Sequence, residues 1–335
     1  MPGVTFWRRA TQAACFVFFV YGGWLFLAAF GSGGASASGL EFLAERPPVV
    51  NAYPPSAVCR FTAHGQAIKG CILELLSKGL TEARPLAQIL PYLTGFLLLA
   101  FLAGRMWCGW VCPLGALGDL FDGLRVRFQY GYWRMAERWR AGLRATSYCL
   151  FAATLAVSWI FRPGRFTTPG ACRIYLPFCK ICPARLACPA AAGAMPTWWG
   201  GFANDLETFF TILSYATLAF FVAAFLSMRR MWCHACPIGL VNSWFNRGGG
   251  ATLQKEATRC NRCGACADGC PMGLTHVRDE KKKENLNTPE CIFCLRCVEL
   301  CPREKCLTFR FFGLPIARSG LSVRKPRARA SERGN

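Results

Sequence analysis

CNRCGACADGCP, at residues 260–271, and CIFCLRCVELCP, at residues 291–302, are the two stretches that decide the fold of the C-terminal part of this chain. Each has four cysteines spaced Cys-x2-Cys-x2-Cys-x3-Cys and ends in proline. Three cysteines at steps of three along a tight loop can reach three corners of a cubane cluster, and the fourth, next to proline, serves the neighbouring cluster. The pattern predicts two [4Fe–4S] clusters in a small α+β domain of the bacterial two-cluster ferredoxin type, over residues 251–312.

The crossed spacing predicts which thiolates share a cluster. The first cluster takes Cys260, Cys263, Cys266 and Cys301, and the second takes Cys291, Cys294, Cys297 and Cys270. Zinc is the alternative metal for Cys-x2-Cys pairs, but a zinc site has two such pairs and lacks both the third cysteine at the same step and the Cys-Pro. Iron held by these eight cysteines is therefore the expected metal, and no catalytic residue is expected beside them.

Composition predicts a membrane protein. Of the 335 residues, 53% are hydrophobic and 17% are charged, which is a low charged fraction for a soluble protein. The net charge of +21 would suit a nucleic acid, but the basic residues fall beside apolar segments and in the tail, residues 313–335, which we expect to be disordered. No nucleic acid partner is expected, because no fold signature accompanies the charge. The 21 cysteines do not indicate a secreted disulfide scaffold, which would lack long apolar runs.

Four apolar intervals predict membrane-spanning helices, because each is close to the ~20 residues that a helix needs to cross the hydrocarbon. They cover residues 12–31, 85–104, 145–161 and 207–228. The expected fold is an all-α membrane part of four transmembrane helices followed by the ferredoxin domain. The first interval also fits a cleaved signal peptide ending near residues 35–37, although its length favours a retained helix.

Basic residues in the short flanks predict the orientation of these helices. The cytoplasmic parts would be the N-terminus 1–11, the loop 105–144, the segment 229–250, the ferredoxin domain and the C-terminus. Two loops, 32–84 and 162–206, would face outward. The sequence therefore predicts a multi-pass protein of the inner (cytoplasmic) membrane, in contact with membrane lipid, with its ferredoxin domain on the cytoplasmic side.

An internal repeat precedes the ferredoxin domain. RMWCGWVCPLG, residues 105–115, recurs as RMWCHACPIG, residues 230–239, and each copy follows an apolar interval. Duplication of a helix–motif unit explains the repeat, so the two cysteine pairs should lie at the same depth. The pairs are Cys108 with Cys112 and Cys233 with Cys236, and the second has two intervening residues where the first has three. Their role is open between shared ligation of a metal or further redox centre, a disulfide within each pair, and packing beside a turn.

Nine other cysteines lie outside these motifs. Six are in the two predicted outer loops: Cys59, Cys71, Cys172, Cys179, Cys182 and Cys188. An outward location favours disulfides, whereas the Cys-x2-Cys-Pro and Cys-Pro elements among them also fit a metal centre, and free thiols are the third alternative. Cys15, Cys149 and Cys306 stand apart from any group and are expected to be packing residues.

Absent motifs constrain the chemistry. None of the three histidines, His64, His234 and His276, lies in an apolar interval, so no haem is expected. The sequence has no glycine-rich nucleotide-binding element. Asp119 and Asp122 follow the first cysteine pair and are expected on a solvated helix face rather than as proton donors. His234 is expected to be an interfacial polar residue, the alternative being an acceptor for a quinol proton.

The tandem ferredoxin stretches, the paired cysteine–proline motifs at helix ends and the four apolar intervals resemble the NapH family. These are the membrane polyferredoxins of periplasmic nitrate reductase systems. Their relatives include the methylamine-utilisation protein MauN, the nitrous-oxide regulator NosR and the oxidase-assembly protein CcoG. The resemblance covers most of residues 86–306 and implies an electron carrier rather than a terminal enzyme.

What the resemblance implies about partners is more specific. Electrons would pass between the quinol pool or a cytoplasmic donor and a membrane or extracytoplasmic reductase or oxidase, with the chain as a subunit of a quinol dehydrogenase complex. The implied partners are the quinone pool and a redox protein, or a further ferredoxin subunit. Likeness to CcoG and NosR implies an alternative, an assembly or regulatory factor that reduces a metal or thiol while another enzyme matures. A passive membrane anchor is the third alternative.

Overall fold

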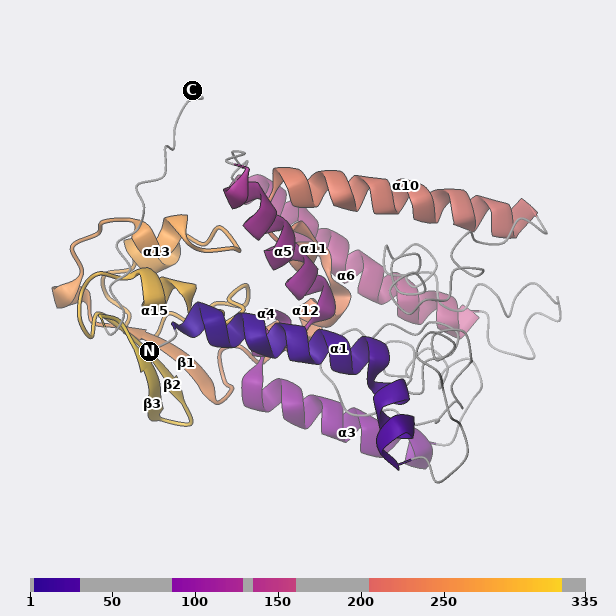
Figure 1. Ribbon diagram of the computed structural model, residues 1–335, viewed down its shortest axis with the longest axis horizontal. Helices are drawn as coiled ribbons and strands as arrows, with labels where there is room; N and C mark the ends of the chain where they lie inside the picture. Colours follow the sequence, from indigo (N-terminus) through magenta and orange to yellow (C-terminus); the bar gives the residue numbers. More distant parts are fainter. Residues whose placement is uncertain (1–2, 31–85, 129–134, 161–204, 321–335) are drawn as a thin grey trace. The chain divides into compact units, whose positions relative to one another are not determined.

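A computed structural model describes residues 3–30, 86–128, 135–160 and 205–320 of the chain (Figure 1). The chain divides into two compact units. The first is formed by Met1–Ala13, Leu98–Ala145 and Ala224–Asn335, and the second by Ala14–Leu97 and Thr146–Ala223. The first unit contains both copies of the repeat and the ferredoxin domain, so the candidate redox centres that the structure describes all belong to it.

A three-stranded antiparallel sheet flanks the two cysteine stretches. Its strands follow the order β1 (Ala251–Lys255), β2 (Leu307–Phe311) and β3 (Leu314–Arg318). β1 comes before the first cysteine stretch and β2 after the second, and the two strands pair along their whole length. The sheet thereby joins the two ends of the ferredoxin domain and holds the cysteine stretches between them.

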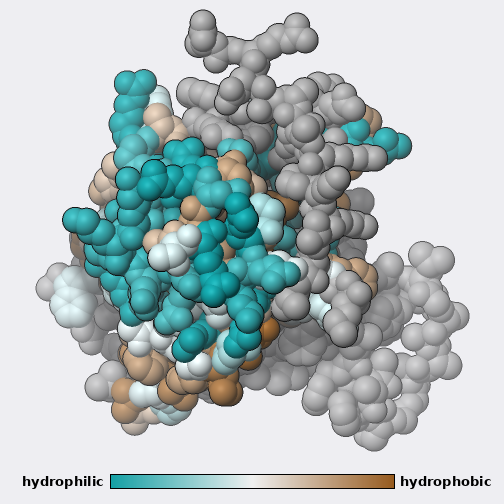
Figure 2. All heavy atoms as spheres, turned by 90° about the vertical axis from the view of Figure 1, so that its left-hand side faces the viewer, coloured by the Kyte–Doolittle hydropathy of each residue, from teal (hydrophilic) through white to brown (hydrophobic). Residues whose placement is uncertain are grey.

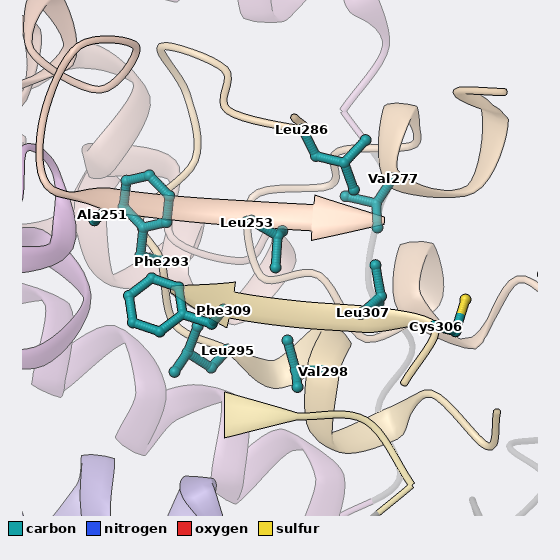
Figure 3. Close-up of a cluster of buried hydrophobic side chains, with 10 residues drawn as sticks. All are labelled: Ala251, Leu253, Val277, Leu286, Phe293, Leu295, Val298, Cys306, Leu307 and Phe309. Carbon is teal, nitrogen blue, oxygen red and sulfur yellow. The ribbon is translucent and has the colours of Figure 1, made fainter. Parts of the chain in front are cut away.

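One hydrophobic core supports both cysteine stretches (Figure 3). Leu253 of β1 lies opposite Phe309 of β2, and both side chains are 2% exposed. The ring of Phe293, from the second cysteine stretch, has its centroid 6.0 Å from that of Phe309. The other members of this core are Ala251, Val277, Leu286, Leu295, Val298, Cys306 and Leu307. Burial of these side chains fixes the cysteine loops against the sheet.

The two cysteine stretches turn through left-handed residues at matching positions. In the first stretch, φ is 55° at Arg262 and 83° at Gly264, and in the second it is 45° at Phe293 and 57° at Leu295. Such residues bend the chain tightly, so that successive backbone N–H groups face the concave side of the loop. The short helical turns of the domain are η3 (Ala257–Arg259), α13 (Ala265–Asp268), α14 (His276–Asp279) and α15 (Arg296–Leu300).

Each copy of the repeat forms a short helix, a turn that contains the second cysteine, and another helix. The first copy forms α4 (Met106–Trp110) and α5 (Pro113–Arg127), and the second forms α11 (Met231–Ala235) and α12 (Pro237–Trp244). Proline opens the second helix of both copies, at a position where its missing N–H costs nothing. Val111, the extra residue of the first copy, lies in the turn after α4. The shorter spacing of the second copy therefore leaves both of its helices intact.

Four long helices coincide with the apolar intervals. They are α1 (Val4–Phe30), α3 (Leu86–Ala103), α6 (Glu137–Ile160) and α10 (Asp205–Ser227). Parts of these four helices are the elements of the second unit that the structure describes. Their remaining turns belong to the first unit, where α1 contributes its N-terminal end and α6 its charged first turns.

No helix within the described residues has both the length and the apolar composition needed to cross a membrane. The predicted fold class of four transmembrane helices is therefore wrong, and so is the predicted multi-pass localisation in the inner membrane with a cytoplasmic ferredoxin domain. Charges that were expected to flank two of the apolar intervals lie within the helices: α1 includes Arg8 and Arg9, and α6 includes Glu137, Arg140 and Arg144.

The surface of the ferredoxin domain is largely polar. Figure 2 shows the side that carries α13, α15 and the sheet, and hydrophilic residues predominate on it. The outer strand β3 is the exception, because its Leu314 and Ile316 side chains are 67% and 63% exposed. The polar face shown in Figure 2 is therefore the part of the domain that would contact water or a charged partner.

The left-handed conformation of Gly264 leads to a stability prediction. A Cβ added there would have only Asp268 Oδ2 within 4 Å, at 3.7 Å, so a methyl group has room, but φ of 83° is unfavourable for any residue with a side chain. We expect Gly264→Ala to lower the free energy of unfolding by about 1–2 kcal/mol in anaerobic chemical denaturation.

Gly142→Ala is the matched control. Gly142 lies inside α6, and an added Cβ there has nothing within 4 Å. Alanine should leave the free energy of unfolding unchanged or raise it by up to about 1 kcal/mol, because glycine weakens a helix interior. Equal losses of stability in the two variants would contradict the role given to the left-handed turn.

Candidate iron–sulfur centres

Cys260, Cys263, Cys266 and Cys301 form the first group of thiols. The Cys266 sulfur interacts electrostatically with each of the other three. Cys301 comes from the second cysteine stretch and the others from the first, so this group is crossed between the stretches. Cys306 lies beside it, within hydrogen-bond reach of Cys260 and Cys301.

A second group contains Cys270, Cys291, Cys294 and Cys297. The Cys297 sulfur interacts with the other three and also with Cys266 of the first group. Cys270 is the member contributed by the first stretch. The two groups are therefore neighbours, and each takes its fourth thiol from the other stretch.

The two cysteine pairs of the repeat form a third group. Cys236 interacts electrostatically with Cys108, Cys112 and Cys233, and Cys112 interacts with Cys108 and Cys233. All four are free thiols, so neither pair is a disulfide in this structure. The thiols of the two copies thus meet, although the spacing within the copies differs by one residue.

Backbone N–H groups donate hydrogen bonds to sulfur in all three groups. Such bonds favour the charged thiolate over the neutral thiol. Hydrogen bonds to sulfur are also among the factors that set the potential of an iron–sulfur cluster. The donors are Ala267 to Cys266, Met272 and Leu274 to Cys270, Phe293 to Cys291, Gly115 to Cys112 and Gly239 to Cys236.

Burial opposes ionisation of the same thiols. It raises the pKa of Cys266 and Cys270 to about 11 and that of Cys112 and Cys291 to about 12. Bound iron would reverse this effect, because a metal-coordinating thiol is deprotonated outright. Four thiols to a group, with N–H donors directed at their sulfurs, are a donor set that fits an iron–sulfur cluster.

Buried positive charge exceeds buried negative charge among the described residues. Only two carboxylates, Asp119 and Asp122, are buried, against seven cationic side chains. An uncompensated buried charge is strongly destabilising. Clusters bound by four thiolates are anionic, so they would supply the missing negative charge. The seven cations are Arg8, Arg105, Arg125, Arg140, Arg229, Arg230 and Lys255.

The structure contains no ready-made site for a single metal ion among the described residues, in the sense of three or more His, Cys, Asp or Glu side chains around one point. A cubane cluster needs a wider set than one ion does, because each of its four thiolates binds a different iron atom. The crossed groups of four thiols are sets of that kind.

Two arginines connect the copies of the repeat reciprocally. Arg230, at the start of the second copy, donates from Nη1 to the Cys108 carbonyl of the first copy at 3.0 Å. Arg105, its counterpart in the first copy, donates from Nη2 to the Cys233 carbonyl of the second. Each arginine thus holds the turn in which the other copy places its first cysteine.

Glycine at the matching position of each copy leaves room for these arginines. A Cβ at Gly115 would lie 3.2 Å from Arg230 Nη1, and one at Gly239 would lie 3.1 Å from Arg105 Nη2. At Gly115 the added atom would also come within 2.7 Å of the Cys108 carbonyl oxygen, closer than a real Cβ allows. The Pro-x-Gly end of each motif therefore serves the contact between the copies.

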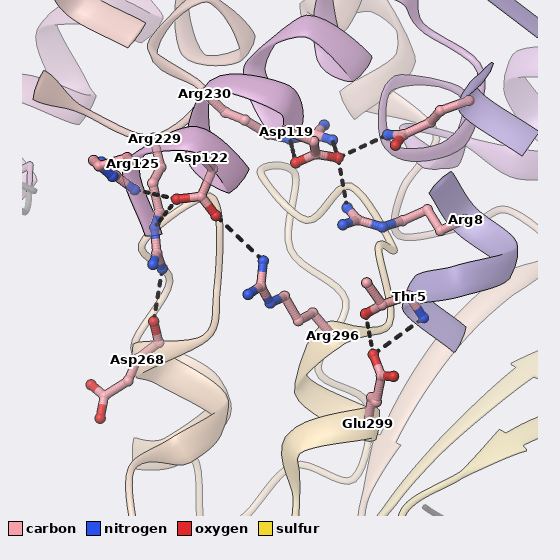
Figure 4. A network of polar contacts seen from close by, with 11 residues as sticks. Thr5, Arg8, Asp119, Asp122, Arg125, Arg229, Arg230, Asp268, Arg296 and Glu299 are labelled. Carbon is pink, nitrogen blue, oxygen red and sulfur yellow. Dashed lines mark hydrogen bonds and ion pairs between the residues drawn. The ribbon is translucent and has the colours of Figure 1, made fainter. Parts of the chain in front are cut away.

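Asp119 of α5 is the carboxylate on which three side chains converge (Figure 4). Its two oxygens accept from Arg230 at 3.1 and 2.5 Å, and Arg8 Nη1 and Gln12 Nε2 lie 3.1 and 2.9 Å from Oδ2. Burial alone would raise the pKa of Asp119, but Arg230 and Arg8 lower it to about 2. Because the ordinary value is 3.8, the stabilisation is complete above about pH 4 and is lost as the pH falls toward 2.

Asp122 forms a second ion-pair centre one turn further along α5. It accepts from Arg229 Nε at 3.0 Å and Arg296 Nη1 at 3.4 Å, and it pairs with Arg125. Arg229 also donates to the Asp268 carbonyl at 2.9 Å, so α5 is tied to α13 of the ferredoxin domain (Figure 4). Asp119 and Asp122 are only 7% and 8% exposed. The expectation that they lie on a solvated face is therefore wrong, because arginines distant in sequence cover them.

The second cysteine stretch is anchored to the repeat through its backbone. Trp110 Nε1 donates to the Phe293 carbonyl at 2.9 Å, and Asn246 Nδ2 donates to the Cys291 carbonyl at 2.7 Å. Gly109 packs so closely on this loop that an added Cβ would lie 2.3 Å from the Ile292 carbonyl oxygen. The cysteine loop and the repeat therefore hold each other in place.

The remaining candidate residues have simpler surroundings. Burial, followed by Arg105, lowers the pKa of His234 to about 3, so its ring is neutral at pH 7. His276 Nε2 lies 3.0 Å from the Leu286 carbonyl, and Cys306 belongs to the ferredoxin core.

Cys15 is half-buried in α1 and Cys149 is exposed in α6. Six cysteines, with His64, lie outside the described residues: Cys59, Cys71, Cys172, Cys179, Cys182 and Cys188.

Sequence reasoning missed several polar residues that build the site. Arg8 and Gln12 stand in an apolar-looking N-terminal segment, and Asn242 and Asn246 follow the second motif without a recognisable pattern. Asn242 Nδ2 lies 3.9 Å from Cys108 Sγ, and Asn246 occupies the position that Asp122 has in the first copy. Alignment of the two copies beyond their cysteines is the signal that could have identified Asn246, whereas Asn242 aligns with Gly118 and gives no such signal.

The Asp119 network leads to a prediction about stability. Asp119→Asn removes the charge that compensates two buried guanidinium groups, those of Arg8 and Arg230. Loss of one partner of a buried ion pair typically costs about 3–5 kcal/mol. We expect a loss of that size in anaerobic denaturation at pH 7.

Glu256→Gln is the matched control, because Glu256 pairs with Arg259 in a bridge whose two side chains are both 48% exposed. An exposed ion pair contributes about 0–1 kcal/mol, so this variant should unfold almost like the wild type. A similar small effect of Asp119→Asn would contradict the view that the Asp119 pairs are buried and essential.

Comparison with known families agrees with these thiol groups. The sequence profile of a 4Fe-4S dicluster domain matches residues 252–302. The profile of a second family, a 4Fe-4S binding domain, matches twice, at residues 92–130 and 210–254. These two matches contain the two copies of the repeat. Iron–sulfur binding is thus a property of the families that this chain matches, and no solved structure matches it significantly.

Curated relatives are similar at low identity over much of the chain. The Escherichia coli protein YccM, named as a candidate electron transport protein, is 24% identical over 312 residues, which cover 91% of this chain and 75% of YccM. Protein MJ0750 of Methanocaldococcus jannaschii is 25% identical, covering 70% of this chain and 84% of that protein. The ferredoxin-type protein NapH of Escherichia coli is 25% identical, covering 62% of each chain. The chain is therefore similar to the NapH-like polyferredoxins, and the matched families and relatives support an iron–sulfur electron-transfer protein of the NapH and YccM type.

Proposed function

We propose that this protein carries electrons through two adjacent [4Fe–4S] clusters with crossed ligand sets. Cys260, Cys263, Cys266 and Cys301 would hold one cluster, and Cys270, Cys291, Cys294 and Cys297 the other. A cluster of this type gains or loses one electron at a time without making or breaking a bond to substrate. The observation that carries the proposal is the packing of both thiol groups against one hydrophobic core, which makes them neighbours. The cysteines in contact with it are Cys260, Cys266 and Cys301 of one group and Cys291 and Cys297 of the other.

The surroundings of the thiols support electron transfer rather than catalysis. Backbone N–H groups face the sulfurs, so little has to rearrange when the charge changes. Among the eight ferredoxin cysteines, Cys263 of the first group is exposed and Cys294 of the second is buried. Exchange with a redox partner would therefore take place on the side of the first group.

A quinol is the electron donor that the resemblance to NapH favours, and the acceptor would be a partner redox enzyme. Two one-electron centres side by side suit a quinol, which gives up two electrons and two protons. The alternative is a factor that passes the electrons on to a metal or a thiol of an enzyme under assembly. The quinol-linked carrier and the assembly factor differ in the source of their electrons and in the molecule that accepts them.

The crossed ligand sets lead to the first functional prediction. Cys270→Ala should remove the same low-temperature EPR signal as Cys291→Ala, although Cys270 lies in the other stretch. Likewise, Cys301→Ala should remove the signal that Cys260→Ala removes. Anaerobic EPR of the dithionite-reduced variants, together with iron quantification, checks this.

Cys306→Ala is the control, since Cys306 neighbours the first group but belongs to neither ligand set. It should keep both signals and the full iron content. If Cys270→Ala instead removed the signal that Cys260→Ala removes, each stretch would bind its own cluster. That result would contradict the crossed arrangement.

The choice of electron donor leads to the second prediction. Menaquinol and ubiquinol analogues, added anaerobically to the oxidised protein, should reduce the clusters and bleach their visible absorption. The double variant Cys260→Ala with Cys291→Ala, which lacks both ferredoxin clusters, should lose the part of the bleaching that these two clusters contribute. No bleaching by quinol, together with reduction of added Cu²⁺ by the pre-reduced protein, would instead favour the assembly factor.

A further inference from the structure

We propose that Cys108, Cys112, Cys233 and Cys236 together hold a third four-iron cluster, shared between the two copies of the repeat. The inference rests on the proposed function, since it adds a centre to the same electron carrier. Neither copy has enough cysteines for a cluster by itself, because each provides two thiols. The structure brings the four together, and the Cys236 sulfur interacts with the other three.

The reciprocal arginines explain how two copies make one site. Arg230 holds the Cys108 carbonyl and Arg105 holds the Cys233 carbonyl, so each copy fixes the turn of the other. These bonds hold the backbone of the first cysteine of each copy against the arginine of the other copy. The one-residue difference in spacing falls in the turn after α4, at Val111, and does not disturb this arrangement.

Three of the four sulfurs have an N–H donor directed at them. Gly115 donates to Cys112 and Gly239 to Cys236, at equivalent positions of the two copies. The fully buried Asn242 places its Nδ2 3.9 Å from Cys108 Sγ. A neutral thiol packed in a core has little need of such donors, whereas a thiolate that binds iron is stabilised by them.

The charges around the four thiols also favour an anionic group. Arg105, Arg230 and Arg8 are buried there with one carboxylate, Asp119, which leaves an excess of two positive charges (three minus one). Burial of guanidinium groups beside neutral thiols would leave this excess uncompensated. A cluster with four thiolate ligands carries net negative charge and would balance it.

The position of the third group fits an electron carrier. Cys108 and Cys233 pack in one hydrophobic cluster with Cys270, Cys291 and Cys294 of the second ferredoxin group. The second group in turn adjoins the first through Cys297 and Cys266. The three groups of thiols therefore follow one another, with the group of the repeat at one end and the exposed Cys263 at the other.

Two single substitutions test whether one shared cluster exists. The wild type, reconstituted anaerobically with iron and sulfide, should contain about twelve iron atoms per chain, eight from the ferredoxin motifs and four from the shared site. Cys108→Ala and Cys233→Ala should each lower the content to about eight, and the double variant should lower it no further. Separate sites in the two copies would instead give additive losses and overturn the shared cluster.

The EPR signals of the ferredoxin clusters separate this inference from the proposed function. Both signals should persist in Cys108→Ala and Cys233→Ala, which also shows that these variants fold. Cys149→Ala, an exposed cysteine of α6, is the control and should keep all twelve iron atoms, to within about one. About eight iron atoms in the wild type, unchanged by Cys108→Ala, would overturn the third cluster and leave the proposed function intact. Absence of both ferredoxin signals in the wild type would overturn the two together.

Discussion

The ion pair between Arg230 and Asp119 is the interaction on which the rest of the first unit depends. It joins the second copy of the repeat to α5 of the first, and Arg8 brings the start of α1 to the same carboxylate. The same Arg230 side chain holds the Cys108 carbonyl. Because all three charged groups are buried, the network is stable only as a whole, and removal of one member leaves the others uncompensated. The position of the repeat cysteines follows from this network.

The ferredoxin domain is held to the repeat by a different kind of contact. Asn246 and Trp110 donate to carbonyls of the second cysteine stretch, and Arg229 donates to a carbonyl at the end of α13. Every residue has a backbone carbonyl, so these contacts do not restrict which side chains the cysteine loops carry. The result is a fixed placement of the ferredoxin thiols next to those of the repeat. Electron transfer between two centres requires that they lie close together, and this fixed placement meets that requirement.

Sequence predicted the parts of the protein that depend on local spacing. The ferredoxin stretches were recognisable because a cubane imposes steps of three along a loop, and the repeat because its motif is nearly identical in both copies. The role of the charged residues could not be read in the same way. Arg8, Arg229 and Arg230 look like basic flanks of apolar segments, whereas in the structure they are buried partners of Asp119 and Asp122. A count of charges along the chain does not contain these long-range pairings, and the same count led to the erroneous membrane-spanning helices.

The central claim is that two neighbouring thiol groups of the ferredoxin domain hold two electron-carrying clusters. An anaerobic potentiometric titration of the whole protein, followed by low-temperature EPR, tests it most directly. Two ferredoxin clusters this close should take up two electrons in separate one-electron steps, and the fully reduced protein should show signals broadened and split by magnetic coupling between the clusters. Uptake of a single electron by the ferredoxin motifs, or two signals without coupling, would contradict the adjacent, crossed arrangement.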